Sequence, residues 1–403
     1  MNIAVIFTKD ADEGGSFQFA LSTSLLLEKN NSEKYNFIFF TTSKNNIKIF
    51  AHYNLVFNYL PWSDVDRLIS QLFCSQLISN IVRKLKIKSK SKFDRVLEKH
   101  NIDLVYFLNP SDLSSVTAQY NYILTVWDLC FRDFMEFPEV REEREFERRE
   151  KLYRAALGKA MHIIADSEFT KKSIMKRYAI DEERISILPL TPSISVKITE
   201  QEYLKNYVDI HKKYNVDGKY IFYPAQLWPH KNHIYILKGL KILKEKYDVK
   251  IHAIFSGSDK GNLKFVLKKA KEFGISEQVH YIGFVDDKEM PYLYRQALAL
   301  VMPTYFGPTN MPPLEAFKLG CPVLYSDLTG LREQVEGAAI LLDLKKPESL
   351  CGGILKIINK SPEIGMLIEN GKKKNDSLLC DEKQWWRLKN IFDDYVPKME
   401  CWK

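Results

Sequence analysis

The sequence has few cysteines, and none of them stand at the short spacings that mark a metal site. Its six cysteines are scattered over 403 residues with no CxxC pair, which argues for reduced thiols and against a disulfide framework or a zinc site. The chain also lacks any run of about 18 apolar residues, and its first residues follow a short strand pattern instead of a signal-peptide pattern. We therefore expect a cytoplasmic protein that neither spans a membrane nor carries a cleaved signal, and that holds no metal.

Enough apolar residues are present to build more than one core. Hydrophobic residues make up 45% of the chain and charged residues 27%, which is typical of a soluble globular protein. A chain of 403 residues is too long for one ordinary core, so two domains are expected. The formal net charge of +8 suits anionic partners such as nucleotides or acidic lipids, although so modest an excess can equally serve solubility.

Short apolar, β-branched runs alternate with helical patterns in the first half of the chain. The runs are residues 2–8, 36–41, 54–58, 103–108, 122–128, 162–166 and 185–188. Alternation of this kind predicts a parallel sheet covered by helices, with ligands at the carboxyl ends of the strands.

After a polar connector over 192–216, the same alternation restarts. Its runs are residues 219–223, 249–255, 279–282, 299–302 and 323–325. The chain is therefore predicted to be α/β, with Rossmann-like domains over 1–195 and 216–380. A final helical pattern over 381–395 carries Trp385 and Trp386, whose rings we expect in a core.

Two features of the first half follow predicted strands. Gly14 and Gly15 come after the first strand and would let a phosphate or sugar approach the backbone, but they lack the GxGxxG spacing, so an ordinary tight turn is the alternative. Asp128 ends the strand at 122–128, where open α/β sheets bind ligands, but it could also cap a helix.

The stretch from 299 to 336 is the most informative part of the second half. It reads as a buried strand, a loop rich in Pro, Gly and Asn, and a helix that we expect to open at Pro312 and Pro313 with Glu315 in its first turn. A helix N-terminus with a nearby carboxylate can hold an anion and a polyol. The alternative is that Glu315 only favours the start of the helix.

The stretch 83–92 is basic, with apolar residues between its lysines. Such a stretch could lie on an anionic membrane surface, or it could be a solvated charged face. Nearby, Asp64-Val65-Asp66 forms a D-x-D triplet directly after Ser63. Because it falls at a predicted helix start, we interpret it as capping and not as a metal motif.

Several motifs between about residues 120 and 380, taken in order, resemble those of family 4 retaining glycosyltransferases, which have the GT-B fold. The motifs are VWDLCFRDFMEFPEV, IIADSEFTKKSIMKRYAIDEERISILPL, PAQLWPHKNHIYILKGL, IFSGS, YIGFVDDKEMPYLYRQA and MPTYFGPTNMPPLEAFKLGCPVLYSD. The resemblance implies two Rossmann-like domains facing a cleft. The first would bind the acceptor, the second would bind the nucleotide-sugar donor, and a helix over 381–403 would pack back on the first.

Three residues would carry the reaction if the resemblance holds. Lys231 would neutralise the leaving diphosphate, Glu315 would hold the donor ribose hydroxyls, and Asp128 would lie near the acceptor hydroxyl. The resemblance implies further donor contacts, with glycines against the diphosphate or sugar, two residues framing the base, and backbone N–H groups near the start of a helix. These residues are Gly14, Gly15, Gln226, Gly257, Phe284, Val285, Thr309, Asn310 and Met311.

The chain departs from the family pattern at three positions. The first of two glutamates is replaced by Gly307, an arginine by Gln226, and the histidine of a His-Asp pair by Trp127. Losing a carboxylate and a guanidinium together keeps the local charge balance, which favours a variant subgroup. Asn310, Thr309 or His230 could supply the missing hydrogen bonds.

The resemblance implies sugar transfer with retention, without a metal and without a cofactor other than the UDP-, GDP- or dTDP-sugar substrate. The sugar is expected to be mannose or rhamnose, and the acceptor a lipid-linked surface polysaccharide such as O-antigen or capsule, built at the inner membrane face. The alternatives are a nucleotide-sugar isomerase of the 2-epimerase type and a non-catalytic sugar-binding relative. Nucleic acid is not expected as a partner, because 83–92 has no stacking platform.

Overall fold

The computed structural model describes residues 1–11, 14–63, 65–66, 91–117, 119–378 and 381–402. The chain forms two compact units. The first comprises Met1–Leu129, Arg144–Pro189 and Cys380–Lys403, and the second comprises Cys130–Glu143 and Leu190–Leu379. Of the basic stretch 83–92, residues 83–90 lie outside the described part, so its predicted membrane contact stays a prediction.

The first unit is built on a seven-stranded parallel sheet in the order β3-β2-β1-β4-β5-β6-β7. Each central strand is a continuous apolar run that is buried on both faces, as expected where helices cover a parallel sheet. The strands are β1 (Asn2–Phe7), β2 (Asn36–Thr41), β3 (Phe57–Tyr59), β4 (Leu104–Phe107), β5 (Tyr122–Val126), β6 (His162–Ala165) and β7 (Ile185–Ile187).

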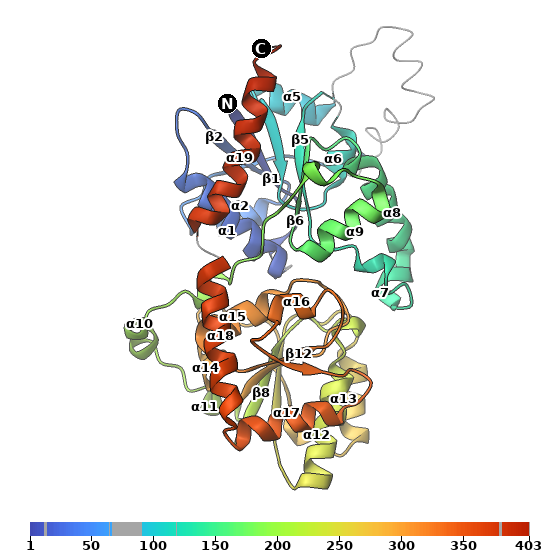
Figure 1. Ribbon diagram of the computed structural model, residues 1–403, viewed down its shortest axis with the longest axis vertical. Coiled ribbons are helices and arrows are strands. Elements are labelled where there is room, and N and C mark those ends of the chain that lie inside the picture. Colours follow the sequence, from blue (N-terminus) through green and yellow to red (C-terminus); the bar gives the residue numbers. More distant parts are fainter. Residues whose placement is uncertain (12–13, 64, 67–90, 118, 379–380, 403) are drawn as a thin grey trace. The chain divides into compact units, whose positions relative to one another are not determined.

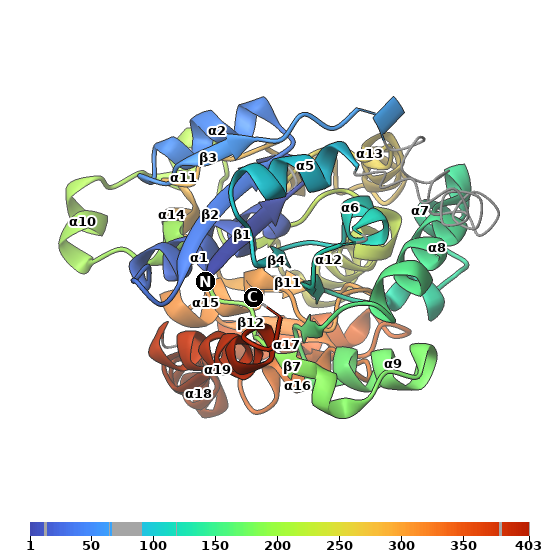
Figure 2. The same cartoon turned by 90° about the horizontal axis from the view of Figure 1, so that it is seen from above.

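Helices follow most of these strands. Helices α8 and α9 lie side by side (Figures 1 and 2), and the ring centroids of Tyr153 and Tyr178 are 6.1 Å apart. The helices of this unit are α1 (Gly15–Lys29), α2 (Lys44–Ala51), α5 (Lys92–Lys99), α6 (Asp112–Val116), α8 (Glu145–Leu157), α9 (Glu168–Tyr178) and α19 (Asp381–Met399).

The C-terminal helix α19 belongs to the first unit and runs beside β2 and α1 (Figure 1). Trp385 packs edge-on against Tyr35 and Phe37, with ring centroids 6.0 and 6.2 Å apart. Lys34 reinforces the contact by an ion pair of 2.5 Å with Asp393. The expectation for Trp386 was wrong, because its side chain points outward and is 63% exposed.

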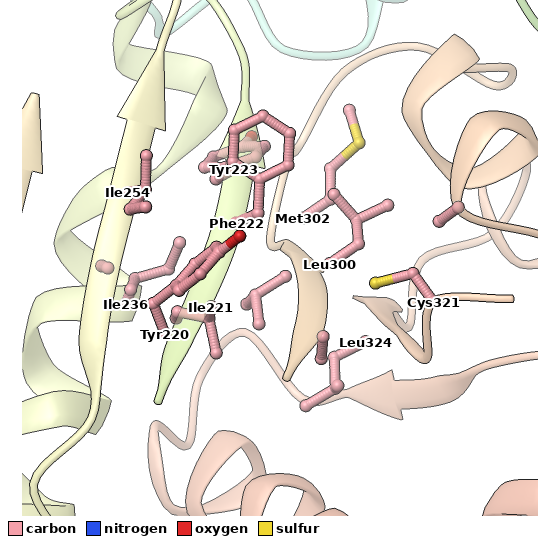
Figure 3. Close-up of a cluster of buried hydrophobic side chains, with 14 of the residues drawn as sticks. Tyr220, Ile221, Phe222, Tyr223, Ile236, Ile254, Leu300, Met302, Cys321 and Leu324 are labelled. Carbon is pink, nitrogen blue, oxygen red and sulfur yellow. The ribbon is translucent and has the colours of Figure 1, made fainter. Parts of the chain in front are cut away.

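The second unit is built on a six-stranded parallel sheet in the order β10-β9-β8-β11-β12-β13. Large apolar side chains from its central strands and from α12 fill the core (Figure 3). The strands are β8 (Tyr220–Pro224), β9 (His252–Ser256), β10 (Val279–Tyr281), β11 (Ala299–Met302), β12 (Val323–Ser326) and β13 (Ile340–Leu342). The edge strand β13 was not predicted.

Two groups of helices cover this sheet (Figure 1). Helices α12, α13 and α17 form one group, and α14, α15 and α18 form the other. In the second group, α18 packs closely on α15, because a Cβ added to Gly371 of α18 would lie 2.5 Å from the Phe317 ring of α15. The helices of the unit are α7 (Pro138–Arg141), α10 (Glu200–Lys205), α11 (Ile210–Tyr214), α12 (His233–Tyr247), α13 (Leu263–Glu272), α14 (Met290–Gln296), α15 (Met311–Leu319), α16 (Arg332–Val335), α17 (Glu348–Ile358) and α18 (Pro362–Leu378).

The predicted connector over 192–216 is not a linker. It carries α10 and α11, and the Tyr203 ring stacks on Tyr292 of α14 with centroids 4.7 Å apart. Burial of these rings draws the connector into the second unit, so the units divide between Pro189 and Leu190.

Residues 130–143 belong to the second unit, whereas the sequence suggested the first. Phe134 and Phe137 pack against Tyr305 and Phe306, with ring centroids 5.3 to 6.3 Å apart across the cluster. Between α7 and α8, Glu143 and Arg144 both adopt left-handed backbone angles, with φ of 52° and 58°. The chain returns to the first unit there.

Two smaller findings concern the first unit. The strand expected at 54–58 begins only at Phe57, because Asn54 has φ of 59° and turns the chain. The capping interpretation of the D-x-D triplet is confirmed for its described part, since Ser63 Oγ accepts a hydrogen bond from the Asp66 N–H and Asp66 accepts two from Ser63. Across the described ranges, no helix has the length and apolarity needed to cross a membrane.

Candidate functional site

In the second unit, the order of the strands reverses between β8 and β11. The connections that leave these two strands at their carboxyl ends run to opposite sides, and open α/β sheets bind their ligands at such a point. The predicted donor residues follow β8, β9, β10 and β11. The fold therefore brings these loops to one edge of one sheet.

Gln226 and Lys231 lie on the loop after β8. Gln226 Oε1 accepts a hydrogen bond of 2.9 Å from the Trp228 indole, and the Lys231 carbonyl accepts one of 2.9 Å from the Tyr223 hydroxyl. Lys231 ends a short 3₁₀ turn, Pro229–Lys231, and is half-buried. The loop thus holds its lysine by backbone contacts and leaves the ammonium group to be oriented by other partners.

Gly257, after β9, is required by close packing of two loops. An added Cβ would lie 2.8 Å from backbone atoms of Ala225 and Gln226, and its φ of 128° suits only glycine. Its N–H donates to the Gly283 carbonyl at 2.8 Å. After β10, Phe284 is 71% exposed whereas Val285 is buried, so the two residues predicted to frame a base differ in how much they offer a ligand.

Asn310 is the centre of the hydrogen-bond network in this site. Its Oδ1 accepts a bond of 3.3 Å from Lys231 Nζ, and its Nδ2 donates to the Gly307 carbonyl at 2.7 Å and to the Tyr325 hydroxyl at 2.6 Å. Gln334 clamps its backbone, accepting from the N–H at 2.8 Å and donating to the carbonyl at 2.6 Å. Both amide hydrogens of Asn310 are therefore used, and its side chain positions Lys231.

Gly307 holds the loop in a shape that a glutamate would disturb. Its φ is 88°, and an added Cβ would lie 3.1 Å from both amide atoms of Asn310 and 3.3 Å from the Thr309 carbonyl oxygen. The glycine predicted to replace a glutamate is thus linked to the position of Asn310. Thr309 itself is half-buried beside this network.

Glu315 does not lie in the first turn of its helix, contrary to the sequence-based expectation. Because Asn310 is extended and clamped as the N-cap, α15 begins at Met311, and Glu315 falls in the second turn, where its side chain is 5% exposed. It accepts a hydrogen bond of 2.6 Å from the Tyr294 hydroxyl. Burial raises the pKa of Glu315, opposed by hydrogen bonds from Ser193 and Tyr294. A carboxylate kept at such a cost is not explained by helix capping.

The start of α15 offers fewer N–H groups than the motif suggests. Its second and third residues are Pro312 and Pro313, which have no backbone N–H. The Asn310 N–H is already bonded to Gln334. Among the first three helical residues, only Met311 can donate to a ligand through its backbone, so Lys231 is the main positive group assigned to the site.

His230 is committed to the 130–143 segment. Its backbone N–H and Nδ1 both donate to Glu139 Oε1, at 3.0 and 2.6 Å, and its ring stacks on Phe306 with centroids 4.3 Å apart. Burial acts to raise the pKa of Glu139, but the hydrogen bonds from His230 outweigh it and the pKa is lowered. His230 therefore docks the segment, which makes it a poor substitute for the glutamate that Gly307 is predicted to replace.

The remaining candidates, Gly14, Gly15 and Asp128, lie in the first unit. Gly14 precedes α1 with φ of 62°, and its carbonyl accepts from the N–H groups of the first helical turn. Asp128 follows β5, and its charge acts with that of Glu145 against burial to raise the pKa of Arg149. Trp127, which is predicted to replace a histidine, packs edge-on against Phe19 with ring centroids 6.4 Å apart.

Sequence reasoning missed four side chains that support the site. Tyr294 and Ser193 hold Glu315, and Tyr325 and Gln334 hold Asn310. Tyr325 and Tyr294 offered one signal, since a tyrosine buried in a strand or helix core needs a partner for its hydroxyl. Nothing in the pattern of the sequence points to Ser193 or Gln334.

His233, two residues after Lys231, makes the site acid-sensitive. Burial, aided by the charge of Lys231, lowers its pKa from 6.5 to about 3. As the pH falls, His233 is therefore protonated in the unfolded chain before it is protonated in the folded protein. The contribution of neutral His233 to the free energy of unfolding is complete above about pH 6.5. It is lost between about pH 6.5 and pH 3, at up to roughly 1.4 kcal/mol per pH unit.

We expect His233→Phe to flatten this dependence. Phenylalanine keeps the ring contacts with Tyr223 and Phe255, both 4.9 Å between centroids, and cannot bind the proton. The measurement is the free energy of unfolding by denaturant between about pH 4.5 and 7. His162, whose pKa burial lowers to about 4, keeps its own contribution in the variant. An unchanged slope would show that His233 does not control it.

Sequence comparison relates this chain to known proteins. Residues 208–374 match the model of the family described as Glycosyl transferases group 1. The chain is 28% identical to O-antigen chain mannosyltransferase B of Escherichia coli over 56% of this chain and 59% of that protein. It is 25% identical to O-antigen chain mannosyltransferase RfbU of Salmonella typhimurium over 48% and 49%. The chain thus spans about half the length of these curated relatives.

Solved structures show the fold over nearly the whole chain. The Anabaena protein Alr3699/HepE in complex with UDP-glucose aligns with a TM-score of 0.72 at 14% identity, covering 98% of this chain and all of that one. A glycosyltransferase from Rickettsia africae aligns with a TM-score of 0.71 at 13% identity, covering 98% of both. The chain has the GT-B fold, as predicted.

Proposed function

We propose that this protein is a retaining, metal-independent glycosyltransferase. It moves a hexose, with mannose first among the candidates, from a nucleoside diphosphate sugar to a glycan of a surface polysaccharide. The observation that carries the proposal is the site at the switch point of the second unit, where a positioned lysine follows β8 and a buried carboxylate follows the neighbouring strand β11. The family match over residues 208–374 supports the same reaction class.

The residues of the site fit the two ends of a donor. Glu315, on α15, has the acceptor atoms to bind the two ribose hydroxyls. Lys231, held by Asn310 at 3.3 Å, supplies a fixed positive charge where negative charge grows on the leaving diphosphate. In the step itself, the bond from the anomeric carbon to the diphosphate oxygen breaks. The acceptor oxygen bonds to the same face of that carbon, and its proton passes to the diphosphate.

Mannose is proposed because the relatives named above are O-antigen mannosyltransferases. The acceptor follows from the same names, which describe enzymes of O-antigen chains. Asp128, beside Arg149 in the first unit, remains our candidate for the acceptor side. Attachment of residues 83–92 to an anionic membrane is part of the same proposal. It is tested by binding of the full chain to anionic liposomes, with charge reversal at Lys84, Lys86 and Lys88.

The test is a thermal-shift panel of UDP, GDP, dTDP and CMP with their common sugars, run with EDTA present. One nucleotide should raise the melting temperature of the wild type by mass action. The Lys231→Met variant should bind that nucleotide roughly tenfold or more weakly than the wild type, because a hydrogen bond to a charged group contributes about 1.5–3 kcal/mol. Lys264→Met, which removes an exposed lysine of α13, is the matched control and should behave as wild type.

Other outcomes favour the alternatives. If no nucleotide shifts the wild type, Gly307 and Gln226 mark a lost donor site, and a non-catalytic sugar-binding relative takes first place. If a nucleotide sugar is bound and is converted to its epimer without any acceptor, the protein is an isomerase. A shift that appears only when EDTA is omitted contradicts metal independence.

A further inference from the structure

The segment 130–143 is a part of the second unit that the chain reaches directly from the first sheet. It begins two residues after Asp128, which follows β5, and it ends with α7 and the turn after it. Two phenylalanines of the segment pack on Tyr305 and Phe306. The segment therefore contacts the loop that connects β11 to α15.

Glu139 of α7 makes a buried polar contact between this segment and the loop after β8. The side chains of Glu139 and His230 are only 9% and 11% exposed. One carboxylate oxygen, Oε1, accepts from both the backbone N–H and the ring Nδ1 of His230. Because the two donors belong to the backbone and the ring of one residue, the carboxylate fixes both the path of the chain and the orientation of the ring. Hydrogen bonds to a charged acceptor away from water are among the stronger ones in proteins.

His230 is also held by the loop after β11. Its carbonyl accepts a hydrogen bond of 2.9 Å from the Tyr305 N–H, and its ring stacks on Phe306 with centroids 4.3 Å apart. These contacts join the loop after β8 to the loop after β11. Glu139 thus anchors a residue that connects both loops.

Lys231 directly follows His230, so the same turn fixes its backbone. Its N–H donates to the Trp228 carbonyl at 3.0 Å. Its ammonium group reaches Asn310 Oδ1 at 3.3 Å, which is longer than the usual hydrogen bond from nitrogen to oxygen. A small shift of the turn would therefore break this bond.

The partner of Lys231 depends on the same anchor. The Asn310 side chain donates to the Gly307 carbonyl at 2.7 Å, and Gly307 directly follows Phe306, on which the anchored histidine stacks. Glu139 therefore acts on the turn that carries the lysine and on the loop that holds its hydrogen-bond acceptor.

We propose that Glu139 is a positioning residue for Lys231. Acting through His230, it keeps the lysine within reach of Asn310, so that the positive charge is in place before a ligand binds. The site of the second unit is then complete only while residues 130–143 are docked on it. That the lysine meets a diphosphate rests on the proposed function, whereas its positioning by Glu139 does not.

The first experiment measures nucleotide affinity by titration calorimetry, with the nucleotide identified by the thermal-shift panel. Glu139→Ala removes the acceptor, and Glu139→Gln keeps an oxygen for the two bonds from His230. Glu136→Ala, at an exposed position of the same segment, is the matched control. Lys231→Met and the double variant Glu139→Ala/Lys231→Met complete a double-mutant cycle. Melting temperatures show whether each variant is folded.

The second experiment measures hydrogen exchange without any ligand. The N–H groups of Lys231 and Asn232 each close the turn with a hydrogen bond of 3.0 Å. The Gly257 N–H, bonded at 2.8 Å in the loop after β9, is the reference within the same unit. A residue that only stabilises the fold would change exchange at all three amides, whereas a positioning residue changes it at the turn.

We expect Glu139→Ala to bind the nucleotide roughly tenfold more weakly than the wild type, and Glu139→Gln to lose less. The double variant should bind no more weakly than Lys231→Met alone, because Glu139 acts through the lysine. In Glu139→Ala, the two amides of the turn should exchange faster while the Gly257 amide is unchanged. Glu136→Ala should match the wild type in both experiments.

The inference is overturned if folded Glu139→Ala binds the nucleotide as the wild type does, or if its loss and that of Lys231→Met add in the double variant. It is also overturned if exchange at the turn is unchanged or rises equally at Gly257. With nucleotide bound by the wild type, each of these results leaves the proposed function intact. If the wild type binds no nucleotide, the proposed function fails, and exchange at the turn decides the role of Glu139. If Glu139→Ala does not fold, Glu139→Gln is judged by the same comparisons.

Discussion

Glutamine at position 315 should remove donor binding while leaving the protein folded. Glu315→Gln keeps an oxygen that can accept the Tyr294 hydrogen bond of 2.6 Å, so the side chain can stay in place. It loses the charge that, in the function we propose, strengthens bonds to two ribose hydroxyls, each worth about 1.5–3 kcal/mol as a charged hydrogen bond. We expect nucleotide affinity to fall by about 100-fold or more and transfer to become undetectable.

The same substitution should leave the unliganded stability unchanged or increased. Burial raises the pKa of Glu315, which means that the folded state disfavours the charged form, and a neutral amide avoids that penalty. Isothermal titration with the identified nucleotide and the melting temperature of the free protein check the two halves. Glu333→Gln, an exposed position of α16, is the control. Wild-type affinity in Glu315→Gln would remove this residue from the donor site.

Replacing Gly307 by glutamate should impair the protein. Gly307 has φ of 88°, which costs other residues about 1–3 kcal/mol. Its new Cβ would press on the Asn310 amide from 3.1 Å, and a displaced Asn310 no longer holds Lys231. We expect Gly307→Glu to lower transfer by at least about tenfold and the melting temperature by several degrees.

Gly307→Ala separates the backbone effect from the carboxylate. It adds the Cβ without the charge, so it should reproduce most of the loss in stability and part of the loss in transfer. The measurements are initial rates with the identified donor and thermal melts of the free variants. Higher activity in Gly307→Glu than in wild type, with Gly307→Ala impaired, would show that the site accepts a glutamate and that Asn310 does not position the lysine.

The sheets were predictable because local patterns decide them. Continuous apolar runs bounded by turn residues predicted β1, β2, β11 and β12 within a residue or two of their bounds. The alternation of these runs with helices predicted that the strands run parallel. The start of α15 was misplaced by one residue because Gln334, 24 residues after Asn310, clamps the N-cap. A partner so distant in sequence leaves no trace in the helix pattern itself.

The segment 130–143 was misassigned for the same kind of reason. Phe134 and Phe137 look like ordinary apolar residues of the first domain, but their partners Tyr305 and Phe306 lie about 170 residues further along the chain. The prediction for Trp386 was wrong in the opposite direction, since this residue was expected in the core and its side chain is exposed. The orientation of a helix decides such pairs, and that orientation depends on tertiary contacts.

The chain's passage between units limits how its parts can be exchanged with those of other proteins. It enters the second unit at residue 130, leaves after 143, re-enters at 190 and returns at 380. A single recombination joint at Pro189 would therefore deprive the second unit of the segment that docks on His230, and the first unit of α19. A folded chimaera with another GT-B protein needs at least residues 130–143 to be exchanged together with the second unit, so the two units cannot be exchanged at a single joint.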